Sequence, residues 1–485
     1  MHVPSTDLLS RIPAETMLQH RVVPVKEEAQ SFLLGTAGDL RQGLQKDLTF
    51  MLGKQVIPVP IGAAEIDAFL AEHLTAQTTS EKTTVQKRDV ERSSISSSGF
   101  SNRTSVVQQV DALIQSAIER KASDIHIEPY EASFRVRYRM DGVLHEVGEL
   151  PLQRKEAVIS RLKIMARLDI AEKRRPQDGR IRFDHKGHAI DLRVSTLPTD
   201  FGEKVVLRIL DKSSLDLDLE KLGFSPNELK AFRNTIHMPF GMILVTGPTG
   251  SGKTTTLYAA LNELNSPSVN ITTIEDPIEY NLQGINQTHV RSDIGFTFAQ
   301  ALRAFLRQDP NIIMLGEMRD KETVDIAVRA ALTGHLVLST IHTNDAPSTV
   351  VRLTDMGVEP FLVGASVKLV MAQRLVRKIC TNCKSESAPD AQSVDRLKLE
   401  NVPPHLFVGK GCEHCSGTGY RGRTALFEVM PITEEITQLI TRRAAIYEIR
   451  NKAVEQGVRT LRTVAVEKML AGITTIEEVL RETTS

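Results

Sequence analysis

The chain has 485 residues, of which 41% are hydrophobic and 25% charged, as in a globular protein of two to four domains. Its 60 Lys and Arg residues balance 60 Asp and Glu residues, which argues against binding of DNA or RNA by bulk electrostatic attraction. The sequence has no run of about 18 apolar residues and no basic-then-apolar start, so we expect a cytosolic protein that reaches a membrane only through a partner or a surface helix.

Residues 1–75 have the pattern of a small α/β domain. Short apolar runs predict three strands, and leucines at helical spacing predict two helices. The strands are expected at 22–25, 31–34 and 55–60, and the helices at 39–52 and 63–74. No catalytic set is found in this stretch, so we expect it to dock onto a partner.

Residues 76–105 differ in composition, because Ser, Thr, Lys, Arg and Gln dominate. They carry too little apolar area to offset the entropy lost on ordering. We therefore expect a flexible linker. A solvated loop within one domain is the alternative, and the length of the stretch disfavours it.

A second domain is expected at 106–212. An amphipathic helix opens it, and strands follow in hairpins that turn at Asp141-Gly142 and Lys186-Gly187. Four arginines are grouped here: Arg174, Arg175, Arg180 and Arg193. Such a group forms either a solvated basic face or a source of arginine fingers for a neighbouring phosphate site. The second reading predicts a ring oligomer with shared sites.

The third domain, 213–485, carries the most informative stretch, 247–254. It fills the phosphate-binding template G-x-x-x-x-G-K-[ST], follows an apolar strand at 242–245 and precedes a helix at 254–264. Successive backbone N–H groups and the helix N-terminus attract phosphate. Lys253 can reach the outer phosphates, and Thr254 can hold Mg²⁺. The sequence therefore predicts that the chain binds ATP or GTP through Gly247, Pro248, Thr249, Gly250, Ser251, Gly252, Lys253, Thr254 and Thr255.

Three further apolar strands of this domain end in polar residues. They lead to Glu317, to the acids at 275–279 and to His342, which could sense the γ-phosphate. The carboxyl ends of parallel strands are where an α/β sheet holds its ligands. Each residue also has a plainer reading, since Glu275 or Asp276 could cap a turn, Glu317 could pair with Arg319, and His342 could be structural.

The four cysteines form two C-x-x-C pairs, Cys380 with Cys383 and Cys412 with Cys415. Glycines crowd the second pair and suit tight turns. Because a cytosolic chain should not rely on disulfides, we expect four thiolates around one structural Zn²⁺ in a module at 376–424. Free or redox-active thiols are the alternative.

Several stretches together resemble the secretion ATPases of type II secretion and type IV pilus assembly. The resemblance covers about 106–428. Its second-domain stretches are 123–129, 171–180 and 193–196. Its third-domain stretches are the phosphate loop, an aspartate box at 275–280, the segments 316–320 and 333–335, a histidine box at 339–344, the two cysteine pairs and 417–423.

This resemblance implies an α/β P-loop NTPase with a RecA-like parallel-sheet domain, a PAS-like α+β domain before it and the small N-terminal domain. It implies ATP rather than GTP, with Mg²⁺, and a homohexameric ring. In the family, the aspartate-box and acidic-strand glutamates serve Mg²⁺ and water, which maps to Glu279 and Glu317. Arginines that match Arg180 and Arg193 are expected to reach the nucleotide across domains or subunits.

The resemblance further implies an ATP-hydrolysing motor of type II secretion, which powers pseudopilus assembly and the export of folded proteins across the outer membrane. Type IV pilus extension stays an alternative, because residues 1–75 match least. A motor for nucleic-acid uptake or transfer is disfavoured by the zero net charge, so no nucleic acid is expected. The implied partners are inner-membrane platform and docking proteins, reached through 1–75 from the cytoplasm.

Overall fold

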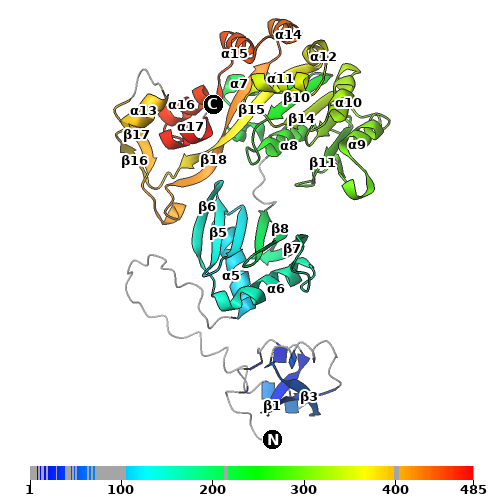
Figure 1. Cartoon of the computed structure of the whole chain (residues 1–485), viewed down its shortest axis with the longest axis vertical. Helices are drawn as coiled ribbons and strands as arrows, with labels where there is room; N and C mark the ends of the chain where they lie inside the picture. The colour runs from blue at the N-terminus through cyan, green and yellow to red at the C-terminus, as the bar shows by residue number, and fades with distance from the viewer. Residues whose placement is uncertain are drawn as a thin grey trace. The chain divides into compact units, whose positions relative to one another are not determined.

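The computed structural model describes residues 105–211, 217–397 and 403–483, together with parts of the segment 8–70. The chain divides into two compact units, residues 1–94 and 95–485 (Figure 1). Among the described residues, no helix is both long and apolar enough to cross a membrane.

The first unit contains a three-stranded sheet. Its strands are β1 (Val22–Glu27), β2 (Ser31–Thr36) and β3 (Gln55–Pro60), with β2 antiparallel to β1 and parallel to β3. Phe32, Leu34 and Val56 are buried in its core. These strands confirm the three that the apolar runs predict. The helices expected at 39–52 and 63–74 and the linker at 76–105 lie largely outside the described residues.

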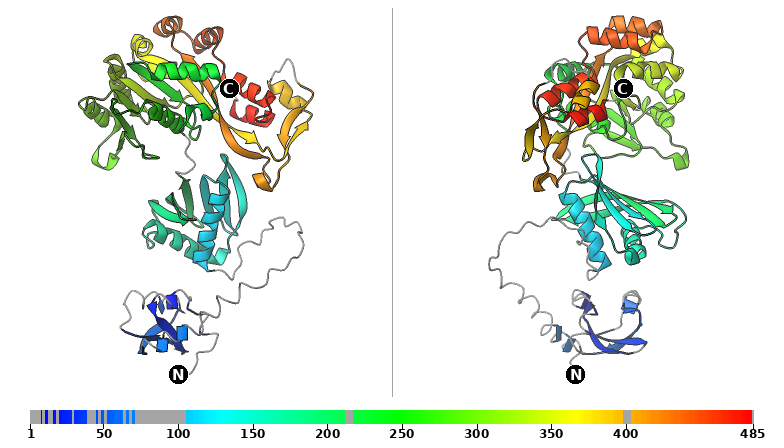
Figure 2. Two further views of the ribbon diagram at one scale, coloured as in Figure 1. Left: turned by 180° about the vertical axis from the view of Figure 1, so that it is seen from behind. Right: turned by 60° about the vertical axis from the view of Figure 1, so that its left-hand side comes forward.

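The second unit begins with a six-stranded antiparallel sheet in the order β6-β5-β4-β9-β8-β7. Helices α5 (Val106–Glu119) and α6 (Lys155–Ala166) cover one face of it (Figure 2). The strands are β4 (Asp124–Pro129), β5 (Phe134–Met140), β6 (Val143–Glu149), β7 (Gln177–His185), β8 (His188–Thr199) and β9 (Gly202–Leu210).

Strand β5 shows why this sheet has one apolar and one charged face. Phe134, Val136 and Tyr138 are buried under the helices, and the arginines between them lie on the opposite face. There, Arg137 donates to Glu128 at 2.7 Å. Although burial raises the pKa of Glu128, hydrogen bonds from Arg137 and Lys204 lower it to about 2. The charged face is thus held by ion pairs.

A seven-stranded sheet forms the centre of the C-terminal part, in the order β12-β11-β13-β14-β10-β15-β18. Its neighbouring strands are parallel except for β18, which runs antiparallel to β15. The strands are β10 (Gly241–Thr246), β11 (Ile271–Glu275), β12 (Asn286–His289), β13 (Ile312–Leu315), β14 (Leu336–Ile341), β15 (Val367–Ile379) and β18 (Tyr420–Pro431).

Helices cover both faces of this sheet. Met242 and Leu244 of β10 belong to the core on one face, and Ile243 and Val245 to the core on the other. Burial on both faces explains the continuous apolar runs in the sequence. The helices are α7 (Pro226–Ile236), α8 (Lys253–Leu264), α9 (Phe298–Phe305), α10 (Lys321–Leu332), α11 (Ala346–Asp355), α12 (Pro360–Ser366), α14 (Glu434–Thr441), α15 (Ile446–Glu455), α16 (Leu461–Leu470) and α17 (Ile476–Glu482).

The chain between β15 and β18 forms a small excursion. It contains β16 (Lys384–Ser387) paired antiparallel with β17 (Leu406–Gly409), and α13 (Ala391–Leu397). In Figure 1 these elements lie beside α16 and α17.

Glu428 of β18 joins two helix starts in the interior. Its carboxylate accepts N–H groups from Ala346 (2.8 Å) and Leu461 (3.1 Å), the first residues of α11 and α16. Burial raises its pKa, and these two amides oppose the rise. One side chain therefore satisfies helix ends that lie more than a hundred residues apart in the sequence.

Candidate active site

The predicted site residues of the C-terminal part follow strands that end at one edge of the seven-stranded sheet. Thr246 at the end of β10 is paired with Ile341 at the end of β14, and Leu315 of β13 with Ser339 of β14 and Ile274 of β11. The phosphate loop, His342, Glu317 and the acids after Ile274 therefore emerge at the same edge, as the sequence predicts. A hydrogen bond from Thr343 N to Thr246 Oγ1 (2.8 Å) ties the loop to the His342 segment.

The loop from Gly247 to Gly252 has a backbone that requires glycine. Gly247, Gly250 and Gly252 have φ of 148°, 81° and 88°. A Cβ on Gly247 would collide with the carbonyl of Gln373 and lie 2.7 Å from Ser251 Oγ. That hydroxyl is buried without a hydrogen-bond partner among the described residues. A tight glycine cradle with an unsatisfied donor, opening helix α8, fits the phosphates of a nucleotide.

Lys253 is the first residue of α8 and lies over the loop. Its Nζ donates to the carbonyl oxygens of Gly247 (2.8 Å) and Pro248 (3.0 Å). Burial, followed by the charge of Arg374, lowers the pKa of Lys253 to about 8, against the opposing effect of Glu317. The Lys253 ammonium is thus held at the loop, where the phosphate oxygens of a bound nucleotide would replace the carbonyl oxygens of Gly247 and Pro248 as its hydrogen-bond acceptors. Thr254, next along the helix, is exposed.

Glu317 is the acid at the sheet edge that lies beside another predicted site residue, His342. The Oε2 of Glu317 forms an ion pair with Arg319, whose Nε lies 2.7 Å away, and it lies 3.4 Å from His342 Nε2. The sequence offered two interpretations of Glu317, an ion pair with Arg319 and a site residue after a strand, and the structure contains the ion pair at that place. The side chain of His342 is exposed. Glu317 and Thr254 are the residues here whose oxygens suit Mg²⁺.

The acids at the end of β11 and after it differ in burial: Glu275 is buried, Asp276 is exposed and Glu279 is half-buried. Glu275 is buried and accepts hydrogen bonds from Tyr258 Oη, Thr273 Oγ1 (2.6 Å) and Gln287 Nε2 (3.1 Å). Gln287 also donates to Tyr280 O (3.0 Å), which holds the segment that carries Glu279. Sequence reasoning missed Tyr258 and Gln287. Tyr258 lies in α8 and Gln287 in β12, and no local pattern in the sequence connects either residue with Glu275.

Glu279 contacts an arginine of the six-stranded sheet. Arg193 Nη1 lies 2.9 Å from Glu279 Oε2, and Arg193 Nη2 donates to Ile278 O (2.8 Å). Arg180 is paired with Arg193 across strands β7 and β8. Its side chain is exposed and makes no hydrogen bond or ion pair with the described residues. The structure therefore brings Arg193 to the acid segment and leaves Arg180 free of a partner in the described part of the chain.

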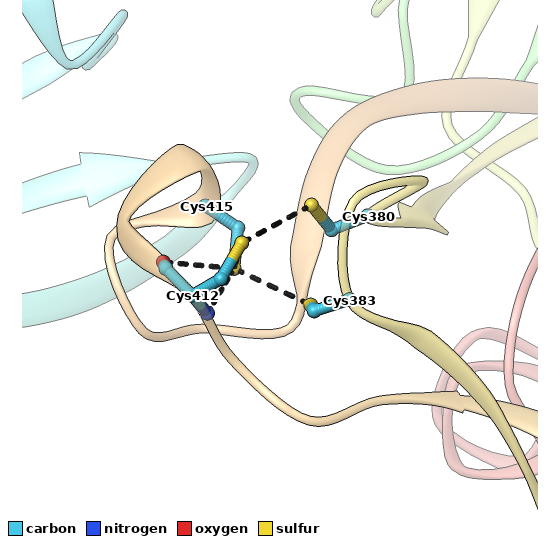
Figure 3. A group of neighbouring side chains, drawn as sticks. All are labelled: Cys380, Cys383, Cys412 and Cys415. Carbon is cyan, nitrogen blue, oxygen red and sulfur yellow. Dashed lines mark hydrogen bonds between the residues drawn. The ribbon is translucent and has the colours of Figure 1, made fainter.

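The four cysteines meet although the pairs lie about thirty residues apart. Cys380 and Cys383 follow β15, and Cys412 and Cys415 face them from the turn before β18 (Figure 3). The Sγ···Sγ distances are 3.8 Å for Cys380–Cys412 and Cys383–Cys415, and 3.7 Å for Cys412–Cys415. Tetrahedral Zn–S bonds of about 2.3 Å give an edge of about 3.8 Å. The cluster fits Zn²⁺, and these distances are far too long for disulfides.

Comparison with known proteins identifies relatives along the whole chain. The model of type II/IV secretion system proteins matches residues 100–481, and that of the MshEN domain matches residues 2–80. The type IV pilus assembly ATPase PilB of Myxococcus xanthus is 46% identical over 98% of this chain and 87% of its own length. The type II secretion system protein E of Xanthomonas campestris is 49% identical over 78% of this chain and 67% of its own.

Two solved structures share the fold. The pilus retraction motor PilT, solved with bound ADP, is 27% identical and superposes with a TM-score of 0.53 over 77% of this chain and 97% of its own. The ATPase DotB of Legionella pneumophila is 22% identical, with a TM-score of 0.57 over 78% of this chain and 96% of its own. Given these matches and the nucleotide cradle at the sheet edge, the chain belongs to the type II/IV secretion system protein family and is an ATPase of that family.

Proposed function

We propose that the chain hydrolyses ATP at the cradle between Gly247 and Thr255 and converts the hydrolysis into mechanical work. Lys253 binds the outer phosphates, and Thr254 and Glu317 hold Mg²⁺, which neutralises charge on the transferred phosphoryl group. Glu317 or Glu279 orients and deprotonates the attacking water, and His342 senses the γ-phosphate. The observation that carries this proposal is the convergence of these side chains at one sheet edge.

The proposed assembly is a homohexameric ring in which Arg180 acts on the nucleotide of a neighbouring subunit. The support is the exposed Arg180 side chain, which has no partner among the described residues of its own chain. Arg193 is committed to Glu279 within the chain, and we propose that it transfers to the nucleotide when the ring forms. An arginine that enters such a site is worth about 10³–10⁵ in rate.

A mixture of two inactive variants tests the shared site. Arg180→Ala and Glu317→Gln chains are each expected to be nearly inactive. In a random 1:1 ring, about a quarter of the sites would combine an intact Glu317 with an intact Arg180 from the neighbour. We therefore expect phosphate release to recover on mixing. A ring made only of chains that carry both substitutions should stay inactive. A mixture of the two single variants that is as inactive as either variant alone would exclude action in trans.

For the cellular role, we propose assembly of a pilin-like fibre at the inner membrane, with type IV pilus assembly as the first candidate. The relatives named type IV pilus assembly ATPases from Myxococcus xanthus and Acinetobacter baylyi match 98–99% of this chain, including its N-terminal domain. Type II secretion is the second candidate, favoured by relatives of that name that are 49–51% identical over 78% of the chain.

The location of the protein follows from this role. We propose that the N-terminal domain, residues 1–75, docks onto inner-membrane platform proteins, that 76–105 is a tether, and that 106–212 and 213–485 form the ring. The chain would then be peripheral at the inner membrane, on its cytoplasmic side, through these partners alone.

Deletion of the gene in its own host distinguishes the two machines. Pilus assembly predicts loss of surface fibres in electron micrographs with normal export, whereas secretion predicts folded exoproteins retained inside the outer membrane. Reintroduced wild-type chain should restore the lost phenotype, and Lys253→Ala should not, because it removes the cation of the phosphate site. Loss of neither fibres nor export would reject both candidates.

A further inference from the structure

Strand β15 passes directly beside the phosphate loop. Thr246, the last residue of β10, is paired with Ala372 of β15. The next two residues of β15, Gln373 and Arg374, therefore lie beyond the end of β10, beside the phosphate loop. Gln373 is buried, and its Oε1 accepts a hydrogen bond from Thr256 Oγ1 of α8 (2.9 Å). Neither residue belongs to the site set that the sequence predicts.

Arg374 is a buried cation without a counter-ion. Only 8% of the residue is exposed. Its guanidinium donates to Asn344 O (2.9 Å), Asn344 Oδ1 (3.4 Å) and Gln373 O (3.1 Å), all of which are uncharged. No carboxylate among residues 105–211, 217–397 and 403–483 forms an ion pair with it. Burial lowers its pKa, and the acids that oppose this effect, led by Glu482 and Glu428, act from a distance.

The half-buried arginine of the same strand, Arg377, is compensated. Arg377, three residues further along β15, donates to Glu478 at 2.8 Å. A buried charge that lacks such a partner is costly, and cations of this kind are normally paired. The missing partner of Arg374 should therefore be an anion that the site receives.

The position of Arg374 indicates which anion this is. Its Nη1 lies 3.1 Å from the point that a Cβ on Gly247 would occupy, which places the guanidinium against the first residue of the cradle. Its charge acts on Lys253, the other cation of the loop. Two cations at one glycine cradle suit a polyphosphate rather than a single carboxylate.

We propose that Arg374 is a second cation of the nucleotide site, which donates N–H groups to the terminal phosphates of the nucleoside triphosphate bound to its own chain. This role rests on the nucleotide site of the proposed function. It gives each subunit an arginine in cis, in addition to any arginine supplied by a neighbour. Because the same guanidinium holds Asn344, two residues after His342, it also contacts the segment that emerges at the γ-phosphate side of the sheet edge.

The test compares affinities for ATP, ADP and AMP in the presence of Mg²⁺, measured by calorimetry on the full chain. Arg374→Met removes the charge and keeps the length of the side chain. Because the lost hydrogen bond is charge-assisted, ATP binding should weaken by about 10- to 100-fold, ADP binding by less, and AMP binding hardly at all. Arg374→Lys, which keeps the charge, should recover part of the loss.

Two controls separate binding from folding. Arg377→Met makes the same change on the same strand and should lower the unfolding temperature by leaving Glu478 with fewer partners, with unchanged nucleotide affinities. Arg374→Met should unfold within a few degrees of the wild type, because the substitution removes the desolvation cost of an unpaired buried charge.

The outcomes are distinguishable. Equal ATP affinity in Arg374→Met and wild type would overturn the role of Arg374 alone. An equal factor of loss for ATP, ADP and AMP would also overturn it, since that would indicate a distorted loop rather than lost phosphate contacts. A wild-type chain that binds ATP no better than Lys253→Ala would overturn the nucleotide site itself, and Arg374 with it.

Discussion

Replacement of Glu317 by glutamine is expected to abolish most ATP hydrolysis while ATP still binds. Glu317 follows β13 by two residues and forms an ion pair with Arg319 at 2.7 Å, close to His342. Glutamine keeps the shape and an acceptor oxygen, but it can neither take a proton from water nor neutralise Mg²⁺. Loss of a general base costs about 10²–10⁴ in rate. Phosphate release at saturating ATP gives kcat, and calorimetry gives the affinity.

Glu322→Gln is the matched control for this experiment. Glu322 lies on α10, five residues further along, and pairs with Arg303 on the surface. Because an exposed ion pair contributes at most about 1 kcal/mol, its loss should leave both kcat and ATP affinity unchanged. Near wild-type turnover in Glu317→Gln would assign the base to another acid, with Glu279 as the first to examine.

Removal of metal from the cysteine cluster is expected to unfold the module around it. Purified chain should carry about one zinc per subunit, because four thiolates at tetrahedral spacing leave no open position. Binding of structural zinc supplies roughly 10 kcal/mol or more of folding free energy in small domains. Cys412→Ser, or chelation of the wild type, should therefore lower the unfolding temperature by about 10 °C or more.

His414→Ala tests whether the ligand set is limited to cysteines. His414 lies between Cys412 and Cys415 and is exposed, so its loss should change neither zinc content nor unfolding temperature. Metal content measured by mass spectrometry decides the outcome. Less than about half an equivalent of zinc in the wild type would contradict a closed structural site.

The nucleotide cradle and the strand ends around it could be predicted because their signals are local. The phosphate loop places its glycines, Lys253 and Thr254 within eight residues, and an apolar strand before each acid or histidine predicts its position at the sheet edge. The cysteine cluster was predicted for the same reason, since each C-x-x-C pair forms one turn. What brings the two pairs together, the long β15–β18 ladder, was not visible in their spacing.

Arg374 and the Glu275 network could not be found in this way. Arg374 is about 120 residues from the loop in sequence, and only the strand order β14-β10-β15 places it beside Gly247. Strand β15 carries four cationic residues, Lys368, Arg374, Arg377 and Lys378, so the sequence does not indicate that Arg374 is the one beside the loop. Similarly, the sequence placed Glu275 among the acids at a strand end, with a turn cap as the plainer reading, and it did not predict the buried network, because the partners Tyr258 and Gln287 come from other elements.

The buried Glu428 has a mechanical consequence for the whole C-terminal part. Its two oxygens hold the leading amides of α11 and α16, so a slide of either helix by one residue would strand a carboxylate in the interior. Such a slip is too costly to occur alone. The segment after His342 and helix α16 should therefore move together, so that a displacement of the nucleotide site is transmitted to α16.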